Sequence, residues 1–187
     1  AADAPLRFTL QLGGGAYEAT LAGAEVVLAP VKNVKVIETA SGKVGYLTFD
    51  NFNAVSEKQL YDAFVTFQQA GVNDLVLDVR YNGGGLLYVA SQLAYMIAGP
   101  ASTGGKVFER SRYNDKTPAY QPIMFRSTAW GFASNNPLRT GTPLPNLGLK
   151  RVTVLSTEGT CSASEAVING LRGADIEVIQ IGGTTCG

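Results

Sequence analysis

Apolar runs of strand length alternate with periodic runs of helix length along most of this chain, and this alternation limits the folds open to it. The strand-like runs occupy residues 44–49, 75–79, 151–155 and 176–181, and the helix-like runs occupy residues 56–71, 86–98 and 162–171. The apolar run at residues 75–79 is typical of a strand covered on both faces. Repeated units of this kind predict an α/β fold with a mainly parallel sheet or a stacked β-α superhelix.

The first helix shows both start and stop signals. Ser56 and Gln59 have the spacing of a capping box, and Gly71 suits the C-terminal end. The apolar residues between them recur on one helical face at Leu60, Ala63, Phe64 and Phe67.

The amino-terminal residues have a different pattern. Residues 8–12, 17–21 and 25–28 are short apolar runs separated by glycine turns, which predicts small strands. Pro30 breaks this pattern, so we expect a residual β segment at residues 1–30 and a second unit at residues 31–187. Within the second unit, residues 99–148 are rich in Gly, Pro, Ser, Asn and aromatic side chains. We expect a long surface excursion there, which could shape a substrate groove around Trp130.

Composition excludes several classes of function. Lys plus Arg and Asp plus Glu both number 15, so the chain has no basic excess for nucleic acid. The chain has no histidine, which removes every Ser-His or Cys-His mechanism. Cys161 and Cys186 are too few for a disulfide framework and lack metal-ligand spacing, so we expect no metal and no other cofactor. No apolar run reaches the ~20 residues that cross a bilayer.

Two loops follow strands whose carboxyl ends should lie at one sheet edge, where ligands gather in α/β folds. The first loop is Gly83-Gly84-Gly85, which leads into a helix. Its backbone N–H groups could stabilise an oxyanion, although a triple glycine could also be a simple connector. It completes no phosphate-binding motif.

The second loop, residues 160–165, ends in Ser162-Ala163-Ser164-Glu165. This spacing is a capping box, so the segment could be only a helix start. A nucleophilic Ser162 is the alternative, because the helix dipole and the Ala163 N–H would stabilise charge on an attacked carbonyl. A hydroxyl bound to its own helix is a poor nucleophile. A catalytic Ser162 should therefore sit just inside the helix.

Together these residues resemble the carboxyl-terminal processing (tail-specific) proteases, which are serine-lysine peptidases on a ClpP/crotonase-like core. Residues 78–87 resemble the Asp-Leu-Arg-x-Asn-x-Gly-Gly loop of that family, and residues 162–165 resemble its nucleophile motif. The resemblance covers residues 44–187. The strands before Pro30 resemble the end of the PDZ domain that precedes the core in this family.

The resemblance implies a site and an activity. Ser162 would be the nucleophile, and Ala163 with a glycine of the Gly84-Gly85 pair would supply the oxyanion-hole N–H groups. Two further residues match supporting positions of the family, Glu165 and Thr185. The implied reaction is endopeptidase cleavage of polypeptides that are recognised near their C-terminus. The implied location is the bacterial periplasm or the cell exterior.

The resemblance stops one residue before the family's general base. The family continues Gly-x-x-Thr-x-Gly-Lys, and here residues 182–187 supply all but the lysine. We therefore expect truncation, proteolysis or disorder at this point, and a nearly inactive chain whose parent is active. Burial must lower the lysine pKa for it to accept a proton, and the strand at residues 176–181 could bury it. The lysines present match no family motif: Lys32, Lys35, Lys43, Lys58, Lys106, Lys116 and Lys150.

Three questions stay open at this point. A non-catalytic peptide-binding or scaffolding relative could share the fold, and so could an acyl-CoA-type enzyme that uses paired N–H groups. Cys161 is expected to be a small packed residue and not a catalytic one, while Cys186 could pair with it or with a residue beyond position 187. The sequence does not address the oligomeric state.

Overall fold

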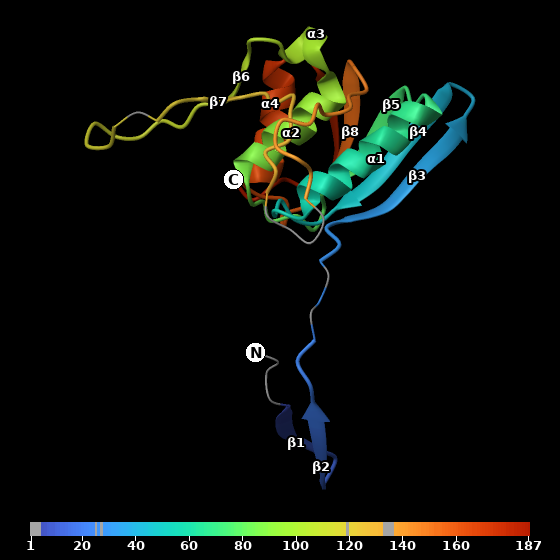
Figure 1. Cartoon of the computed structure of the whole chain (residues 1–187), viewed down its shortest axis with the longest axis vertical. Helices are drawn as coiled ribbons and strands as arrows, with labels where there is room; N and C mark the ends of the chain where they lie inside the picture. Colours follow the sequence, from blue (N-terminus) through green and yellow to red (C-terminus); the bar gives the residue numbers. More distant parts are fainter. Residues whose placement is uncertain (1–4, 25, 27, 119, 133–136) are drawn as a thin grey trace.

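A computed structural model of the chain describes residues 5–24, 26, 28–118, 120–132 and 137–187. Its centre is a five-stranded sheet in the order β3-β4-β5-β8-β9 (Figure 1). β3 (Val31–Thr39) pairs antiparallel with β4 (Gly42–Phe49). β4, β5 (Asp74–Asp78), β8 (Arg151–Ser156) and β9 (Glu177–Gly182) are parallel neighbours. The predicted α/β fold with a mainly parallel sheet is confirmed.

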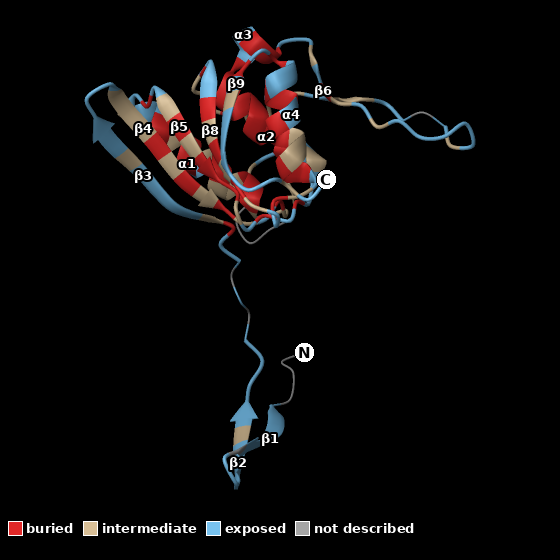
Figure 2. Cartoon of the chain, turned by 180° about the vertical axis from the view of Figure 1, so that it is seen from behind, coloured by how far each residue is buried: buried red, intermediate tan, exposed pale blue. Residues whose placement is uncertain are grey.

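Three helices connect these strands: α1 (Ser56–Ala70), α2 (Leu87–Ala98) and α4 (Ala163–Gly173). Their apolar faces bury the core against β4, β5 and β8 (Figure 2). The predicted face of α1 is buried, with Phe64 and Phe67 fully inaccessible and in edge-to-face contact. The expectation that residues 75–79 are covered on both faces holds only in part. Leu75 and Leu77 are buried on one face, whereas on the opposite face Asp78 is buried but Val76 is only half-buried.

The ends of α1 differ in how well the sequence predicted them. Gly71 ends the helix in a left-handed conformation with φ 70°, as predicted. The predicted capping box at the start of the helix is absent, because Val55 is the N-cap and Ser56 lies inside the helix. The Asn53 side chain accepts the Ser56 N–H at 3.1 Å instead. The Gln59 side chain instead accepts a hydrogen bond from the Val31 N–H at 3.2 Å.

The amino-terminal segment lies apart from the sheet core (Figure 1). β1 (Leu6–Leu12) and β2 (Gly15–Leu21) form an antiparallel hairpin. Of the third predicted strand, Val26 and Leu28 lie in no strand, and residues 25 and 27 fall outside the described residues. Assignment of this segment to a PDZ domain, and the boundary at residue 31, stay predictions.

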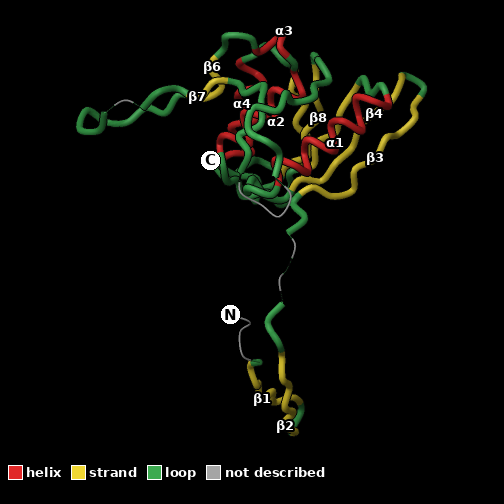
Figure 3. Tube along the Cα trace, viewed as in Figure 1, coloured by secondary structure: helices red, strands yellow, loops and turns green. Residues whose placement is uncertain are grey.

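The predicted excursion at residues 99–148 contains little regular structure (Figure 3). Its elements are α3 (Pro100–Thr103), β6 (Val107–Glu109) and β7 (Ile123–Met124). Phe108 and Phe125 stack edge to face at 5.3 Å and attach the excursion to α4, where Gly170 leaves room for the Phe108 ring. Across the described residues, every helix is too short or too polar for a membrane-spanning segment.

Candidate active site

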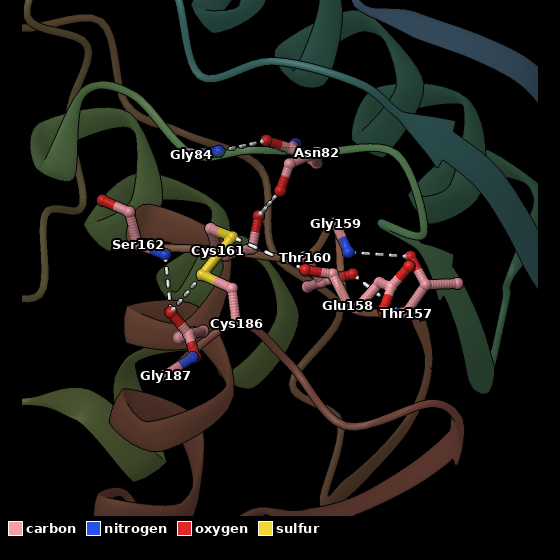
Figure 4. Close-up of a disulfide and its surroundings, with 12 residues drawn as sticks. Asn82, Gly84, Thr157, Glu158, Gly159, Thr160, Cys161, Ser162, Cys186 and Gly187 are labelled. Carbon is pink, nitrogen blue, oxygen red and sulfur yellow. Dashed lines mark hydrogen bonds between the residues drawn. A yellow bond between two sulfur atoms is a disulfide. The ribbon is translucent and has the colours of Figure 1, made fainter.

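The two loops singled out by sequence meet at the carboxyl edge of the sheet. β5 and β8 are parallel neighbours in which Asp78 lies opposite Leu155, so the loops that follow them start side by side. Asn82 joins the loops, because its carbonyl oxygen accepts the Cys161 N–H at 3.1 Å and the Ser164 hydroxyl at 3.0 Å (Figure 4).

The Asn82 side chain also fixes the glycine loop. It is fully buried, donates from Nδ2 to the Phe49 carbonyl at 2.9 Å and accepts the Gly84 N–H at 2.9 Å (Figure 4). Asn82 is the main residue that sequence reasoning missed. The available signal was an amide side chain between a strand and three glycines, in a motif already recognised.

Gly84 is required by close packing against the proposed nucleophile. Its φ of 104° disfavours any other residue, and a Cβ atom there would lie 2.7 Å from Ser162 Cβ and 3.0 Å from Ala163 N. Its own N–H is taken by Asn82. Gly85 is equally constrained, with φ 136° and a Cβ position that collides with the Phe52 carbonyl.

Two backbone N–H groups at this edge remain available. Within the described residues, neither Ala163 N–H nor Gly85 N–H has a hydrogen-bond acceptor. Gly85 forms an isolated parallel bridge with Phe52 in which Gly84 and Leu86 make the bonds. The Gly85 N–H therefore points away from Phe52.

Ser162 is the N-cap of α4 and does not lie inside the helix, which corrects the expected position of a catalytic serine. Its φ of 55° and ψ of −113° are rare for a residue with a side chain and are stable only when the surroundings enforce them. The hydroxyl is placed as in a capping box, facing the backbone N–H of Glu165, but the two groups do not reach the geometry of a hydrogen bond. The side chain is exposed at a sharp turn between β8 and α4.

Glu165 links the serine to the end of the chain. Its carboxylate accepts the Ser162 N–H at 2.7 Å and the Gly187 N–H at 3.2 Å. Partial burial would raise the pKa of Glu165, but hydrogen bonds from the Thr185 side chain and these two N–H groups lower it overall. Glu165 is thus ionised at neutral pH, and it brings Thr185 and Gly187 next to Ser162.

A disulfide joins Cys161 to Cys186, with a Cα–Cα distance of 5.3 Å (Figure 4). Of the two pairings left open for Cys186, the structure has the one with Cys161, and Cys161 is half-buried where a packed residue was expected. The Cys186 N–H donates to the Thr160 carbonyl at 3.1 Å. Thr160 is itself fully buried, with its hydroxyl bonded to the Val79 carbonyl at 2.8 Å. The segment after β9 is therefore attached directly to the nucleophile loop.

An ion pair between buried Asp78 and partly exposed Arg80 supports the start of the glycine loop. Asp78 is almost fully buried, and it accepts hydrogen bonds from Arg80 Nε at 2.9 Å and from the Tyr46 hydroxyl at 2.8 Å. Burial would raise the pKa of Asp78, but the bonds from Arg80 and Tyr46 lower it overall. Among the described residues, the Cys, Asp and Glu side chains form no group of three that could hold a metal ion.

Burial of a general-base lysine by the last strand stays a prediction, and two apolar side chains of β9 are partly exposed. Ile179 is 39% exposed and Ile181 is 53% exposed. Among the lysines present, Lys58 pairs with Asp62, Lys106 with Asp175 and Lys150 with the Ser102 hydroxyl. The described contacts thus bring no lysine to Ser162.

This chain is similar to known proteases. A putative S41 protease from Bacteroides fragilis NCTC 9343 is 33% identical with a TM-score of 0.72, over 98% of this chain and 47% of that one. The photosystem II D1 C-terminal processing protease shares the fold, with 22% identity and a TM-score of 0.56 over 99% of this chain and 45% of that one.

Curated relatives include a probable CtpA-like serine protease of Staphylococcus aureus (strain bovine RF122 / ET3-1). It is 28% identical over 141 residues, which cover 75% of this chain but only 24% of that protein. This chain thus spans about a quarter of the length of such relatives. Residues 43–187 match the sequence profile of peptidase family S41, and the chain belongs to that family of serine-type peptidases.

Proposed function

We propose that this chain carries the nucleophile and the oxyanion hole of an endopeptidase of the carboxyl-terminal processing type. The observation that carries the proposal is the state of Ser162. Its hydroxyl is exposed, held at a strained turn and left without a full cap hydrogen bond. Such strain clusters at functional sites, and a serine used only as a helix cap would not need it.

The oxyanion hole is assigned to the N–H groups of Ala163 and Gly85. Both lack an acceptor in the described residues, and both lie on the loops that Asn82 holds together. The N–H of Gly84 is bonded to Asn82 and is not available for an oxyanion. Gly84 contributes instead through its missing side chain, which lets the loop pack closely against Ser162. Donors that are fixed before reaction stabilise a developing oxyanion without reorganisation.

The general base is assigned to a lysine directly after Gly187. Glu165 accepts N–H groups from both Ser162 and Gly187, so a residue following Gly187 would start beside the nucleophile. A neutral lysine would take the Ser162 proton as the oxygen attacks the peptide carbonyl. It would then return the proton to the departing amine, and water would hydrolyse the acyl-enzyme.

The substrates and the compartment are proposed from the family and from the disulfide. Polypeptides are the substrates that family S41 implies, and recognition near the C-terminus follows the D1 processing protease. The Cys161–Cys186 disulfide supports an oxidising compartment such as the periplasm or the cell exterior.

The test is peptide hydrolysis by a longer protein that continues past Gly187 through the lysine. We expect cleavage by this protein, none by its Ser162→Ala variant and almost none by the 187-residue chain. Ser41→Ala, on the exposed β3–β4 turn, is the control and should cleave normally. If the longer protein cleaved no peptide, the proposal would be contradicted and a peptide-binding module favoured. Cleavage by the Ser162→Ala variant would also contradict the proposal.

A further inference from the structure

Arg126 on the excursion has an unusual environment. Its guanidinium carbon lies 4.6 Å from the centroid of the Trp130 ring and 5.2 Å from the centroid of the Tyr88 ring. The two rings are themselves stacked at 4.8 Å. Contact with two aromatic faces restricts a guanidinium to one orientation and removes part of its hydration.

The charge of Arg126 is uncompensated in the described residues. No carboxylate among them lies within ion-pair distance of it, and its Nε atom is buried without a hydrogen-bond partner. Burying a donor of a charged group without an acceptor is unfavourable. A bound carboxylate is the partner that would neutralise the charge of Arg126, because it matches the guanidinium geometry with two parallel hydrogen bonds.

The support beneath this arrangement is rigid. Glu57 of α1 is buried and accepts the backbone N–H groups of Trp130 at 2.5 Å, Gly131 at 3.0 Å and Phe132 at 3.2 Å. It also accepts the Gln92 amide at 2.6 Å. Four donors thus satisfy Glu57, which holds the Trp130 segment in place against α1 and α2.

The position relative to the nucleophile suits a substrate subsite. Tyr88 follows Gly84 by four residues, so their Cα atoms are at most ~14 Å apart, the span of about four residues of extended peptide. Gly84 touches Ser162. Tyr88 also lies in the first turn of α2, which has no side-chain cap and no acidic residue there. The positive end of that helix dipole adds to the attraction for an anion.

We propose that Arg126, held on Tyr88 and Trp130, binds a carboxylate of the peptide substrate a few residues from the scissile bond. The carboxylate could belong to an acidic side chain or to the C-terminus of the substrate. This assignment rests on the proposed peptidase function, since it names a specificity residue of that site.

The test measures binding and does not depend on catalysis. Trp130 is the only tryptophan of the 187-residue chain, so its fluorescence reports on this site alone. The probes are acetylated alanine pentapeptides with a central Glu or Gln, each with a C-terminal amide, and acetylated penta-alanine with a free carboxylate or an amide. We expect one carboxylate peptide to bind about tenfold more tightly than its neutral partner, and which one does so identifies the source.

Variants separate the site from general charge effects. Arg126→Gln should remove the tenfold preference and Arg126→Lys should keep part of it. Arg112→Gln removes one exposed charge on the same excursion and should keep the preference in full. Equal binding of all peptides to the unmodified chain, or a preference that survives Arg126→Gln, would overturn the proposal. Neither result would affect the hydrolysis test of Ser162, so the two proposals can fail separately.

Discussion

The β1–β2 hairpin and the sheet core use their apolar residues in opposite ways (Figure 2). In the hairpin, Leu6 is 65% exposed and Tyr17 is 60% exposed, whereas Phe64 and Phe67 of α1 are fully buried. A two-stranded hairpin alone is marginally stable in water. The site therefore takes its rigidity from the sheet core, and the hairpin contributes nothing visible to it.

The edge of the sheet core also buries polar residues. Asn82, Thr160 and Ser164 are buried at the carboxyl edge, and hydrogen bonds satisfy each of them. Buried polar networks of this kind fix one arrangement of the backbone. The comparison thus predicts large effects for changes in the core and at its edge, and small effects for changes in the hairpin.

The largest expected effect is loss of stability in the core. Phe64→Ala should lower the free energy of unfolding by about 3–5 kcal/mol, because it leaves a cavity at a fully buried site. Phe8→Ala in the hairpin is the matched control and should change it by less than about 0.5 kcal/mol. Urea denaturation of the chain measures both. Similar losses in the two variants would break the comparison.

Gly84→Ala should damage catalysis in the longer, active protein. The added methyl group would collide with Ser162 Cβ and crowd the Ala163 N–H, so kcat/KM should fall about 100- to 1000-fold. Gly83 is exposed with open space around it, and Gly83→Ala should change kcat/KM by about twofold at most. Equal losses in both variants would mean that the close approach of Gly84 to the serine is unimportant.

Loss of the disulfide should have a smaller effect on stability than loss of the Phe64 ring. Replacing both Cys161 and Cys186 with alanine should lower the free energy of unfolding by about 2–4 kcal/mol, since the cross-link closes a loop with a sequence separation of 25. Dithiothreitol should produce a similar loss in the unmodified chain and no change in the double variant. A reductant effect on the double variant would point to another cause.

The smallest effect concerns pH. The folded state lowers the pKa of Asp78, so its contribution to stability is complete above the ordinary pKa of about 4 and is lost as pH falls through the lowered value. Acid titration of unfolding should show this loss, and Asp78→Asn should remove it. Tyr46→Phe takes away one bond to the carboxylate and should move the loss to higher pH. Identical acid profiles for all three proteins would contradict this role of Asp78.

The sequence predicted the parallel sheet, its helices and the meeting of the two loops, because hydrophobic periodicity is a local signal. β3 was missed because its Val residues do not recur with the period of two that marks a half-buried strand, and most of its side chains are exposed. The Ser56 capping box failed because Asn53 competes for the same N–H.

The finer features of the site depend on contacts between distant residues. Gly84 packs closely against Ser162, and Asn82 bonds to Phe49 from 33 positions away. Neither contact is visible in a local pattern. The motif resemblance pointed to the right loops, whereas the loss of the Gly84 N–H to Asn82 could come only from the structure.

The most direct test of the central claim is mass spectrometry of the longer protein after reaction with a fluorophosphonate, which acylation-competent serines capture. The account predicts one adduct, on Ser162, that disappears in Ser162→Ala and is much reduced in Gly84→Ala. An unlabelled protein that still hydrolyses peptides, or an adduct on another serine such as Ser164, would contradict the assignment of Ser162 as the nucleophile.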